Sequence, residues 1–492
     1  MNLFLLLVLG LVTYFIVQRS VASITKTPVW ILWLVMMTPA FIWSGWIWIN
    51  GEERRMPLIL LLGPFIICPI VYWWLIHLGR RELTPEQAKT PNSPVAPQNL
   101  NGDAQKLSVR PLSSQEEAIL RNCFPWSIYY LQNLEYRPQA VICRGSLRSN
   151  PEVAYKTIKE NIEAQFSDRF YILFQEDFTG KPFFALVPNP QAHRDALRNS
   201  ETLTRPGLAL ALLLVTLFTT TIIGAEIANV TEAAVKSNPG ALLQGLPYAL
   251  SLMTILGIHE LGHYLAAQRY KIRTTLPYFI PVPFFLGTFG AFIQMRSPVP
   301  NRKALFDVAI AGPLAGFIVT IPFLIWGLAN SSVVTLSEKS NMLNFDSFNP
   351  RFSLLMTLLS KLTLGSALTA NVAIDLHPVA VAGYLGVIVT ALNLMPVGQL
   401  DGGHIIHAML GQQAAIAIGQ VARFLLLGWS LVQPGFLLWA IMLFLMPVND
   451  EPALNDVTAL DDRRDFGGLL AIALLIAIVL PMPRLLSGML GI

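Results

Sequence analysis

Charged residues are scarce in this chain of 492 residues, and a dense basic tract is missing. Only 13% of the residues are charged, about half of the roughly 25% that soluble globular proteins carry. The formal net charge is +4, and Lys and Arg nowhere form the kind of cluster that binds nucleic acid. We therefore exclude a nucleic-acid partner, and the composition argues against a water-soluble globular protein.

A cysteine framework and a recognisable targeting segment are absent as well. Cys68, Cys123 and Cys143 form neither a set of disulfides nor a CxxC metal pair, so we expect them to be small buried apolar residues. The apolar stretch from Met1 to Val17 lacks a positively charged n-region and predicts a first membrane anchor rather than a cleaved signal. A Ser- and Arg-rich plastid transit peptide is absent as well, so that, if this is a chloroplast-type protein, the sequence is either the mature form or bacterial.

Long apolar runs are abundant. Hydrophobic residues make up 53% of the chain, and a helix needs about 20 such residues to cross about 30 Å of hydrocarbon. We predict an all-α polytopic membrane protein with about 8–10 transmembrane segments. The predicted segments, of which the first and ninth are short, are Leu3–Val17, Val29–Asn50, Pro57–Leu78, Gly207–Ile227, Leu246–Ala267, Ala304–Leu328, Pro378–Val397, Ala415–Val432, Phe436–Val448 and Phe466–Leu486.

The stretch between the third and fourth apolar runs has a different composition. Pro, Asn and Gln are frequent from Glu82 to Pro111 and indicate a linker. After it, a capping box at Ser113 to Glu116 opens a helix, and a second helix and three short strands follow, over Glu152–Phe166, Ala140–Cys143, Phe170–Gln175 and Phe183–Val187. We therefore divide the chain into N-terminal transmembrane hairpins (1–78), a Pro-rich linker (79–112), a soluble α+β domain (113–205) and a membrane core with C-terminal helices (206–492).

Lys and Arg are distributed unevenly among the predicted loops. Basic residues flank the 79–205 segment and are frequent in the loops after the fifth and before the sixth apolar run. In the loops on the opposite side, positive and negative charges are nearly equal in number. The positive-inside rule then places the basic loops in the cytoplasm, or in the stroma of a plastid, and both termini on the other side. The stretch Arg351–Asp375 is left open as either a crossing or a surface helix.

The strongest motif is His259-Glu260-Leu261-Gly262-His263 within the fifth apolar run. Two histidines four positions apart on a helix project from one face and can hold one Zn²⁺. Glu260 lies between them, where it can take a proton from the attacking water. Ionisable groups in an apolar segment cost several kcal/mol unless they line a cavity or bind a ligand. The motif therefore predicts a metal site, with a polar helix-packing cluster as the alternative.

A catalytic zinc needs a third protein ligand and an open position for water. Asp401, followed by two glycines, ends the segment that contains Asn393, and the predicted topology brings it to the same depth as His263. We therefore predict His259, His263 and Asp401 as the ligands. His404 remains open as a ligand or a neighbour of one, and Asp307 as an interfacial acid or a partner of a ligand histidine.

These motifs carry a resemblance to a known family. The HExxH motif, with Asn393, Pro396 and Leu400-Asp401-Gly402, resembles the site-2 proteases, which are zinc intramembrane metalloproteases. Within that family the chain is most similar to the chloroplast ethylene-dependent gravitropism-deficient and yellow-green proteins of plants and to their cyanobacterial relatives. The similarity runs from about residue 140 to 460, although Ser146 and His404 depart from the usual plastid residues. The intact zinc motifs imply a member of an active branch.

The resemblance implies further roles. Leu276–Met295 would be a membrane-inserted loop and β-hairpin that guides an unwound substrate segment, and its Phe, Ile and Pro alternate with glycines as in a strand edge. A plain interfacial loop is the alternative. Gly287 and Gly290 in this hairpin, together with Asn393, would bind substrate or support the transition state. For Asn393 a simple role in helix packing stays open.

The function expected from these features is zinc-dependent cleavage of transmembrane segments within the lipid bilayer, or regulated intramembrane proteolysis. Membrane-anchored anti-sigma-like regulators are one expected substrate class, and the oligomeric state is not predicted. The host would be the plasma or thylakoid membrane of a cyanobacterium-like cell, or a chloroplast membrane. The alternative is an inactive zinc-binding chaperone, scaffold or transporter, although a transporter would spread polar residues along a pathway.

Overall fold

A computed structural model of the chain describes nine continuous stretches and scattered positions between residues 10 and 78. The stretches are 27–50, 112–137, 140–177, 179–189, 205–283, 286–336, 344–432, 436–448 and 450–491. Contacts divide the chain into two units, Met1–Gln105 and Lys106–Ile492. The predicted linker lies outside the described residues except for Leu112, as do most of the apolar runs Leu3–Val17 and Pro57–Leu78.

The first unit contains the apolar helix α2, Val29–Asn50. Leu32 on this helix is fully buried and packs with Val17, Tyr72 and Leu75. The indole nitrogen of Trp33 donates a hydrogen bond of 2.7 Å to the carbonyl oxygen of Gly10. The helix therefore has apolar neighbours from both the preceding and the following part of the chain.

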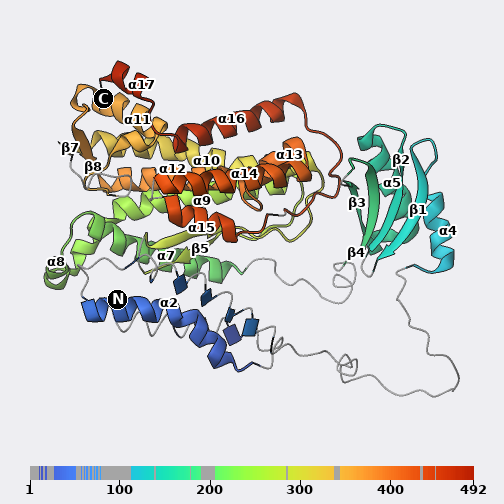
Figure 1. Cartoon of the computed structure of the whole chain (residues 1–492), viewed down its shortest axis with the longest axis horizontal. Helices are drawn as coiled ribbons and strands as arrows, with labels where there is room; N and C mark the ends of the chain where they lie inside the picture. Colours follow the sequence, from blue (N-terminus) through green and yellow to red (C-terminus); the bar gives the residue numbers. More distant parts are fainter. Residues whose placement is uncertain are drawn as a thin grey trace. The chain divides into compact units, whose positions relative to one another are not determined.

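The second unit begins with an α+β domain. Its elements are α4 (Ser114–Asn122), β1 (Tyr129–Arg137), β2 (Ala140–Leu147), α5 (Pro151–Phe166), β3 (Phe170–Glu176) and β4 (Pro182–Pro188). The antiparallel sheet has the order β1-β2-β4-β3 (Figure 1). Its core is aromatic, with the rings of Phe174 and Phe184 stacked 4.2 Å apart.

Local signals in the sequence explain most of this domain. The predicted capping box is formed, since the Ser113 side chain accepts from the Glu116 amide while the Glu116 carboxylate accepts from the Ser113 amide. Asn150 caps α5. The sequence analysis missed β1, because a bulge between Leu131 and Asn133 breaks the alternation of buried and exposed residues.

The remainder of the second unit is a helical core with small sheets. Its longer helices are α7 (Pro206–Ile227), α9 (Leu246–Arg269), α10 (Arg302–Ala329), α12 (Pro378–Leu394), α14 (Gln412–Val432) and α16 (Asp462–Val479). The shorter helices are α8 (Glu232–Ser237), α11 (Leu354–Leu364), α13 (Asp401–Leu410), α15 (Leu437–Leu445) and α17 (Arg484–Leu490). The strands β5 (Tyr278–Pro281) and β6 (Thr288–Phe292) pair antiparallel, as do β7 (Ser332–Thr335) and β8 (Val372–Asp375).

Helix α10 is the centre of the core and packs against α9, α12 and α13 (Figure 1). Small residues bring the backbones close together: a Cβ at Gly262 of α9 would lie 2.5 Å from the carbonyl oxygen of Ala311. A Cβ at Gly327 of α10 would lie 2.3 Å from the amide nitrogen of Ala380 in α12. Membrane helices associate through such contacts because lipid offers little hydrophobic drive for helix pairing.

The chain is a multi-pass membrane protein. Among the described residues, 5 helices are long and apolar enough to cross a membrane, namely Val29–Asn50, Pro206–Ile227, Pro239–Arg269, Arg302–Ala329 and Gln412–Leu431. The predicted runs Leu3–Val17 and Pro57–Leu78 lie mostly outside the described residues and are not part of this count. Phe436–Val448 contains only the 9-residue helix α15, and Arg351–Asp375 contains the 11-residue helix α11, which is too short to cross.

Candidate active site

Helix α9 carries His259 and His263 on one face, as their spacing predicts. Both side chains are buried, with their ring centroids 4.9 Å apart. The Nδ1 atom of His263 lies 2.7 Å from the carbonyl oxygen of Val308 on α10, which can only accept a hydrogen bond. The proton of the neutral ring therefore sits on Nδ1, and Nε2 is left with a lone pair for a ligand bond.

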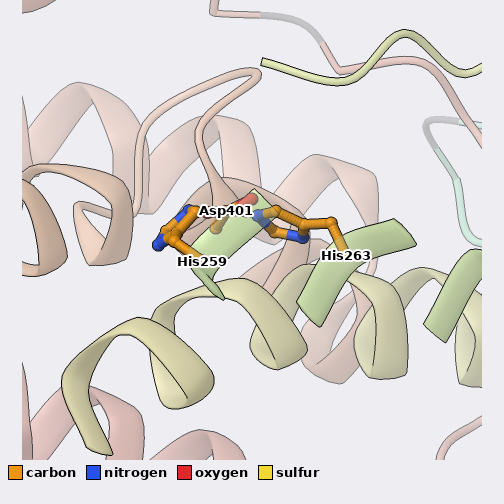
Figure 2. A group of neighbouring side chains, drawn as sticks. All are labelled: His259, His263 and Asp401. Carbon is orange, nitrogen blue, oxygen red and sulfur yellow. Dashed lines mark hydrogen bonds and ion pairs between the residues drawn. The ribbon is translucent and has the colours of Figure 1, made fainter. Parts of the chain in front are cut away.

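Asp401 reaches the two histidines as the first residue of α13. The turn between α12 and α13 is tight, since a Cβ at Gly402 would lie 2.0 Å from the carbonyl oxygen of Leu394. The Oδ2 atom of Asp401 lies 3.6 Å from Nε2 of His259 and 3.3 Å from Nε2 of His263. Figure 2 shows the three side chains pointing toward one another. The structure thus brings together residues that are 138 positions apart in sequence.

This group fits a divalent zinc ion. One ligand atom from each of the three side chains lies within 4.8 Å of the others, and two imidazole nitrogens with one carboxylate oxygen form a recognised catalytic zinc set. Helix α10 leaves room for the ring of His263, because a Cβ at Gly312 would lie 2.1 Å from its Nε2 atom. Among the described residues, no other group of three or more His, Cys, Asp and Glu side chains meets the same criterion.

Asn393 and Glu260 lie beside the three candidate ligands. The amide nitrogen of Asn393, from the last turn of α12, is 3.1 Å from Nε2 of His259. Glu260 is buried, and both residues line the cavity of about 280 Å³ into which the candidate ligands open. A carboxyl group and a side-chain amide therefore share one cavity with the three candidate ligands.

Comparison with known proteins identifies the family of the region that carries this site. Residues 247–427, which contain all of the side chains above, match the model of peptidase family M50, the site-2 proteases. Residues 247–427 are a peptidase family M50 domain. Residues 118–195 match a second family model, the EGY3 middle domain. The match to peptidase family M50 confirms the resemblance to the site-2 proteases that the sequence motifs carry.

Three plant proteins illustrate the relationship. The chain is 30% identical to "Probable zinc metalloprotease EGY2, chloroplastic" of Arabidopsis thaliana, over 74% of this chain and 64% of that protein. It is 35% identical to EGY1 of the same plant, over 48% of this chain and 43% of that protein. The chain is 28% identical to EGY1 of Oryza sativa subsp. japonica, over 77% of this chain and 70% of that protein. The chain therefore spans less than two thirds of the length of the two Arabidopsis relatives.

The two predicted glycines of the hairpin in the M50 domain lie at different positions from the residues that line the cavity. Gly287 has a φ of +80° and packs on α7, where the Thr219 hydroxyl donates a hydrogen bond of 2.7 Å to its carbonyl oxygen. Gly290 has a φ of +107° with open space around its Cα. Neither glycine lines the cavity, whereas Ala291, Phe292 and Ile293 do. The glycines shape the strand, and the residues after them face the site.

The sequence analysis also missed two acids next to α13 of the M50 domain. The Oδ2 atom of Asp450 lies 2.7 Å from Nδ1 of His404 and 2.8 Å from Nδ1 of His407. Both carboxylate oxygens of Asp456 lie 3.0 Å from Nε2 of His407. Burial opposes a charge on His407, but these hydrogen bonds and the two negative charges raise its pKa to about 9. No local motif marks these pairs, which are 43 to 49 positions apart.

Asp307, considered above as a partner of a ligand histidine, has other contacts. Its carboxylate accepts hydrogen bonds of 2.7 Å from Nε and Nη2 of Arg464 and another from the hydroxyl of Tyr270. These contacts join the start of α10 to the start of α16 and to the end of α9. The partner of His263 is the neighbouring carbonyl of Val308 instead.

Proposed function

We propose that this protein is a zinc-dependent intramembrane endopeptidase that hydrolyses transmembrane segments of other membrane proteins. The observation that carries the proposal is the convergence of His259, His263 and Asp401 on one buried cavity that Glu260 shares. Two of the three candidate ligands lie on α9, a helix long and apolar enough to span the bilayer. The M50 domain and the printed zinc metalloprotease names of the relatives agree with this assignment.

His259, His263 and Asp401 would hold the zinc ion, and Val308 would fix the tautomer of His263. Zinc held there supplies Lewis-acid polarisation of the scissile carbonyl and lowers the pKa of water toward 7. Glu260 takes one proton from the attacking water as the new C–O bond forms, and it delivers that proton to the amide nitrogen as the C–N bond breaks. A zinc carrier or scaffold would not need a carboxylate at this position.

The remaining site residues would hold the substrate. The amide of Asn393 donates a hydrogen bond to the substrate carbonyl on which charge develops. The β5–β6 hairpin would lie within the membrane, shaped by Gly287 and Gly290. There the substrate main chain runs along Ala291 to Ile293 as an added strand. Cleavage requires an unwound segment, because a helix keeps its peptide groups hydrogen-bonded within itself.

The proposed setting follows from charge and from the relatives. We place the α+β domain and the zinc site on the cytoplasmic or stromal side, because the basic residues gather in those loops. The full chain would have about 8–10 transmembrane segments, some made of shorter helices such as α12. The relatives named as chloroplastic favour a plastid or thylakoid membrane, with a cyanobacterium-like plasma membrane as the other setting. The α+β domain would dock substrates, and membrane-anchored anti-sigma-like regulators are one such class.

The decisive experiment uses the full chain in lipid vesicles with a fluorogenic peptide that has one apolar segment interrupted by Asn-Gly. The wild-type protein should cleave the peptide, and Glu260→Gln should bind zinc equally but lose about 10²- to 10⁴-fold in rate, as expected when a general base is removed. Glu226→Gln, an exposed acid in the last turn of α7, is the matched control and should retain wild-type activity. Wild-type rates in a zinc-loaded Glu260→Gln protein would contradict the proposal.

A further inference from the structure

A chain of polar side chains, all buried except that of His404, extends from the zinc cavity to the start of α10. It contains His404, Asp450, His407, Asp456 and Arg302. Because both nitrogens of His407 face carboxylate oxygens, both must donate, and this ring is an imidazolium. Buried ion pairs of this kind are weak evidence for a contribution to stability. A role in orienting a side chain is therefore worth testing.

His404 is the member of this chain that reaches the cavity. It lies three positions after Asp401 on α13 and therefore on the same face of the helix. It lines the cavity together with His259, His263 and Glu260. Its side chain is 18% exposed, whereas that of His407 is fully buried. The compact group of candidate zinc ligands contains Asp401 and not His404. His404 thus faces the space that a substrate would fill without completing the metal site.

Asp450 determines which nitrogen of His404 is available. A carboxylate only accepts hydrogen bonds, so Nδ1 of His404 donates its proton across 2.7 Å. Among the residues that the structure describes, Nε2 of His404 has no hydrogen-bond partner. In the neutral form of the ring, Nε2 therefore presents a lone pair. Asp450 is itself held in place by His407 and by the Gln412 amide, which donates 2.9 Å to its backbone carbonyl.

We propose that His404 is a further substrate-binding residue, whose Nε2 accepts a hydrogen bond from a main-chain N–H of the unwound substrate, and that Asp450 is the positioning residue that orients it. This inference rests on the proposed peptidase function. The side chains of a transmembrane segment are mostly apolar, so its main chain is the source of donors. An N–H released by unwinding costs several kcal/mol in a membrane unless it finds an acceptor.

Two amide substitutions separate this role from a structural one. Glutamine places its amide near the position of Nε2 of histidine, whereas asparagine places it near Nδ1. His404→Gln keeps a polar atom toward the cavity and gives up the contact with Asp450, and His404→Asn does the reverse. With the fluorogenic peptide in vesicles, His404→Asn should raise KM about tenfold with little change in kcat, the effect of losing one hydrogen bond to the substrate. His404→Gln should stay within about threefold of wild type.

Peptide binding provides a second readout that does not need catalysis. In the Glu260→Gln background, the same peptide should bind about tenfold more weakly to His404→Asn than to His404→Gln. Both variants should retain wild-type zinc content. Asp450→Ala should raise KM when His404 is present and have a smaller effect in the His404→Gln background, because the glutamine does not depend on Asp450.

The outcomes of these experiments distinguish a failure of the role proposed for His404 from a failure of the proposed peptidase function. If the two variants bind the peptide equally, or if His404→Asn binds it more tightly, His404 only holds Asp450 in place. Either result would overturn the inference. Loss of zinc in both variants would overturn it too, because His404 would then be a ligand. If the wild-type protein binds the peptide but never cleaves it, the proposed function fails. In that case the binding comparison in the Glu260→Gln background still decides the role of His404.

Discussion

The α+β domain and the M50 domain reach stability by different means. The α+β domain has an aromatic core in which Tyr129, Phe174 and Phe184 are fully buried and make edge or stacked contacts. In the M50 domain, glycines such as Gly312 instead bring helix backbones together. Of its buried ionisable side chains, His259, Glu260 and His263 line one cavity. The comparison shows that the first domain fills its core with large aromatic side chains, whereas the second packs its helices closely around a polar site.

The largest expected effect comes from removing both histidines, and it tests whether the α+β domain stays folded when the zinc site is lost. Replacing His259 and His263 together by alanine should abolish zinc binding and cleavage, because one carboxylate alone does not hold a catalytic zinc ion. Metal analysis of the purified protein should fall from about one zinc per chain to none. The α+β domain should stay folded in protease-resistance assays. Full zinc retention in the double variant would rule out the ligand assignment.

A smaller effect tests the close packing around the site. Gly312→Ala would place a Cβ 2.1 Å from Nε2 of His263, against a rigid ring. We expect at least about a tenfold loss of zinc affinity or activity, because overpacking displaces a ligand. The matched control is Gly467→Ala, whose Cβ would meet the Phe306 ring at an ordinary 3.5 Å. Similar zinc affinity in the two variants would mean that the packing around His263 is loose.

The next prediction concerns the aromatic core. Phe184 is fully buried, and Phe184→Ala should destabilise the α+β domain by about 3–5 kcal/mol through loss of burial and a cavity. Limited proteolysis should then cut this domain first while the zinc content remains. Trp126→Ala removes an aromatic ring that is 72% exposed and should have little effect. Loss of zinc in Phe184→Ala would show that the two regions depend on each other.

The smallest expected effect depends on pH. The folded-state pKa of His407 is raised to about 9 from an ordinary value near 6.5. Its stabilising contribution is therefore complete below about pH 6.5 and is lost as the pH rises through about 9. Thermal unfolding of the full chain should shift downward by a few degrees across this range. This dependence of the unfolding temperature on pH should disappear in His407→Asn. It should persist in His377→Asn, a control at the start of α12.

Several features follow from short stretches of sequence. The capping box at Ser113, the helix after Asn150 and the four-residue spacing of the two histidines depend on neighbours within one helical turn. The apolar runs revealed a membrane protein, because about 20 consecutive apolar residues are unfavourable in water. The number of spans was less certain, since a proline or a charged turn ends a helix inside an apolar run, as before Pro396.

Other features required the tertiary structure. Asp401 was named from predicted depth and from family resemblance, but its approach to His263 depends on the tight turn at Gly402. The residues Ala291 to Ile293, which line the cavity, come directly after Gly290, and both Gly287 before β6 and Gly290 within it have positive φ. The pairing of Asp450 with His404 and His407 has no local signature at all.

The sequence by itself determined the membrane setting, the metal-binding helix and the small aromatic domain, because each depends on composition or on spacing within one element. Only the tertiary structure decided which carboxylate meets the histidines, which strand residues line the cavity and which nitrogen of His404 faces it. The contacts of Asp401 with the histidines and of Asp450 with His404 join residues 46 to 142 positions apart. Such contacts form only when separate helices pack, and helix packing depends on the shape of whole surfaces rather than on a local pattern.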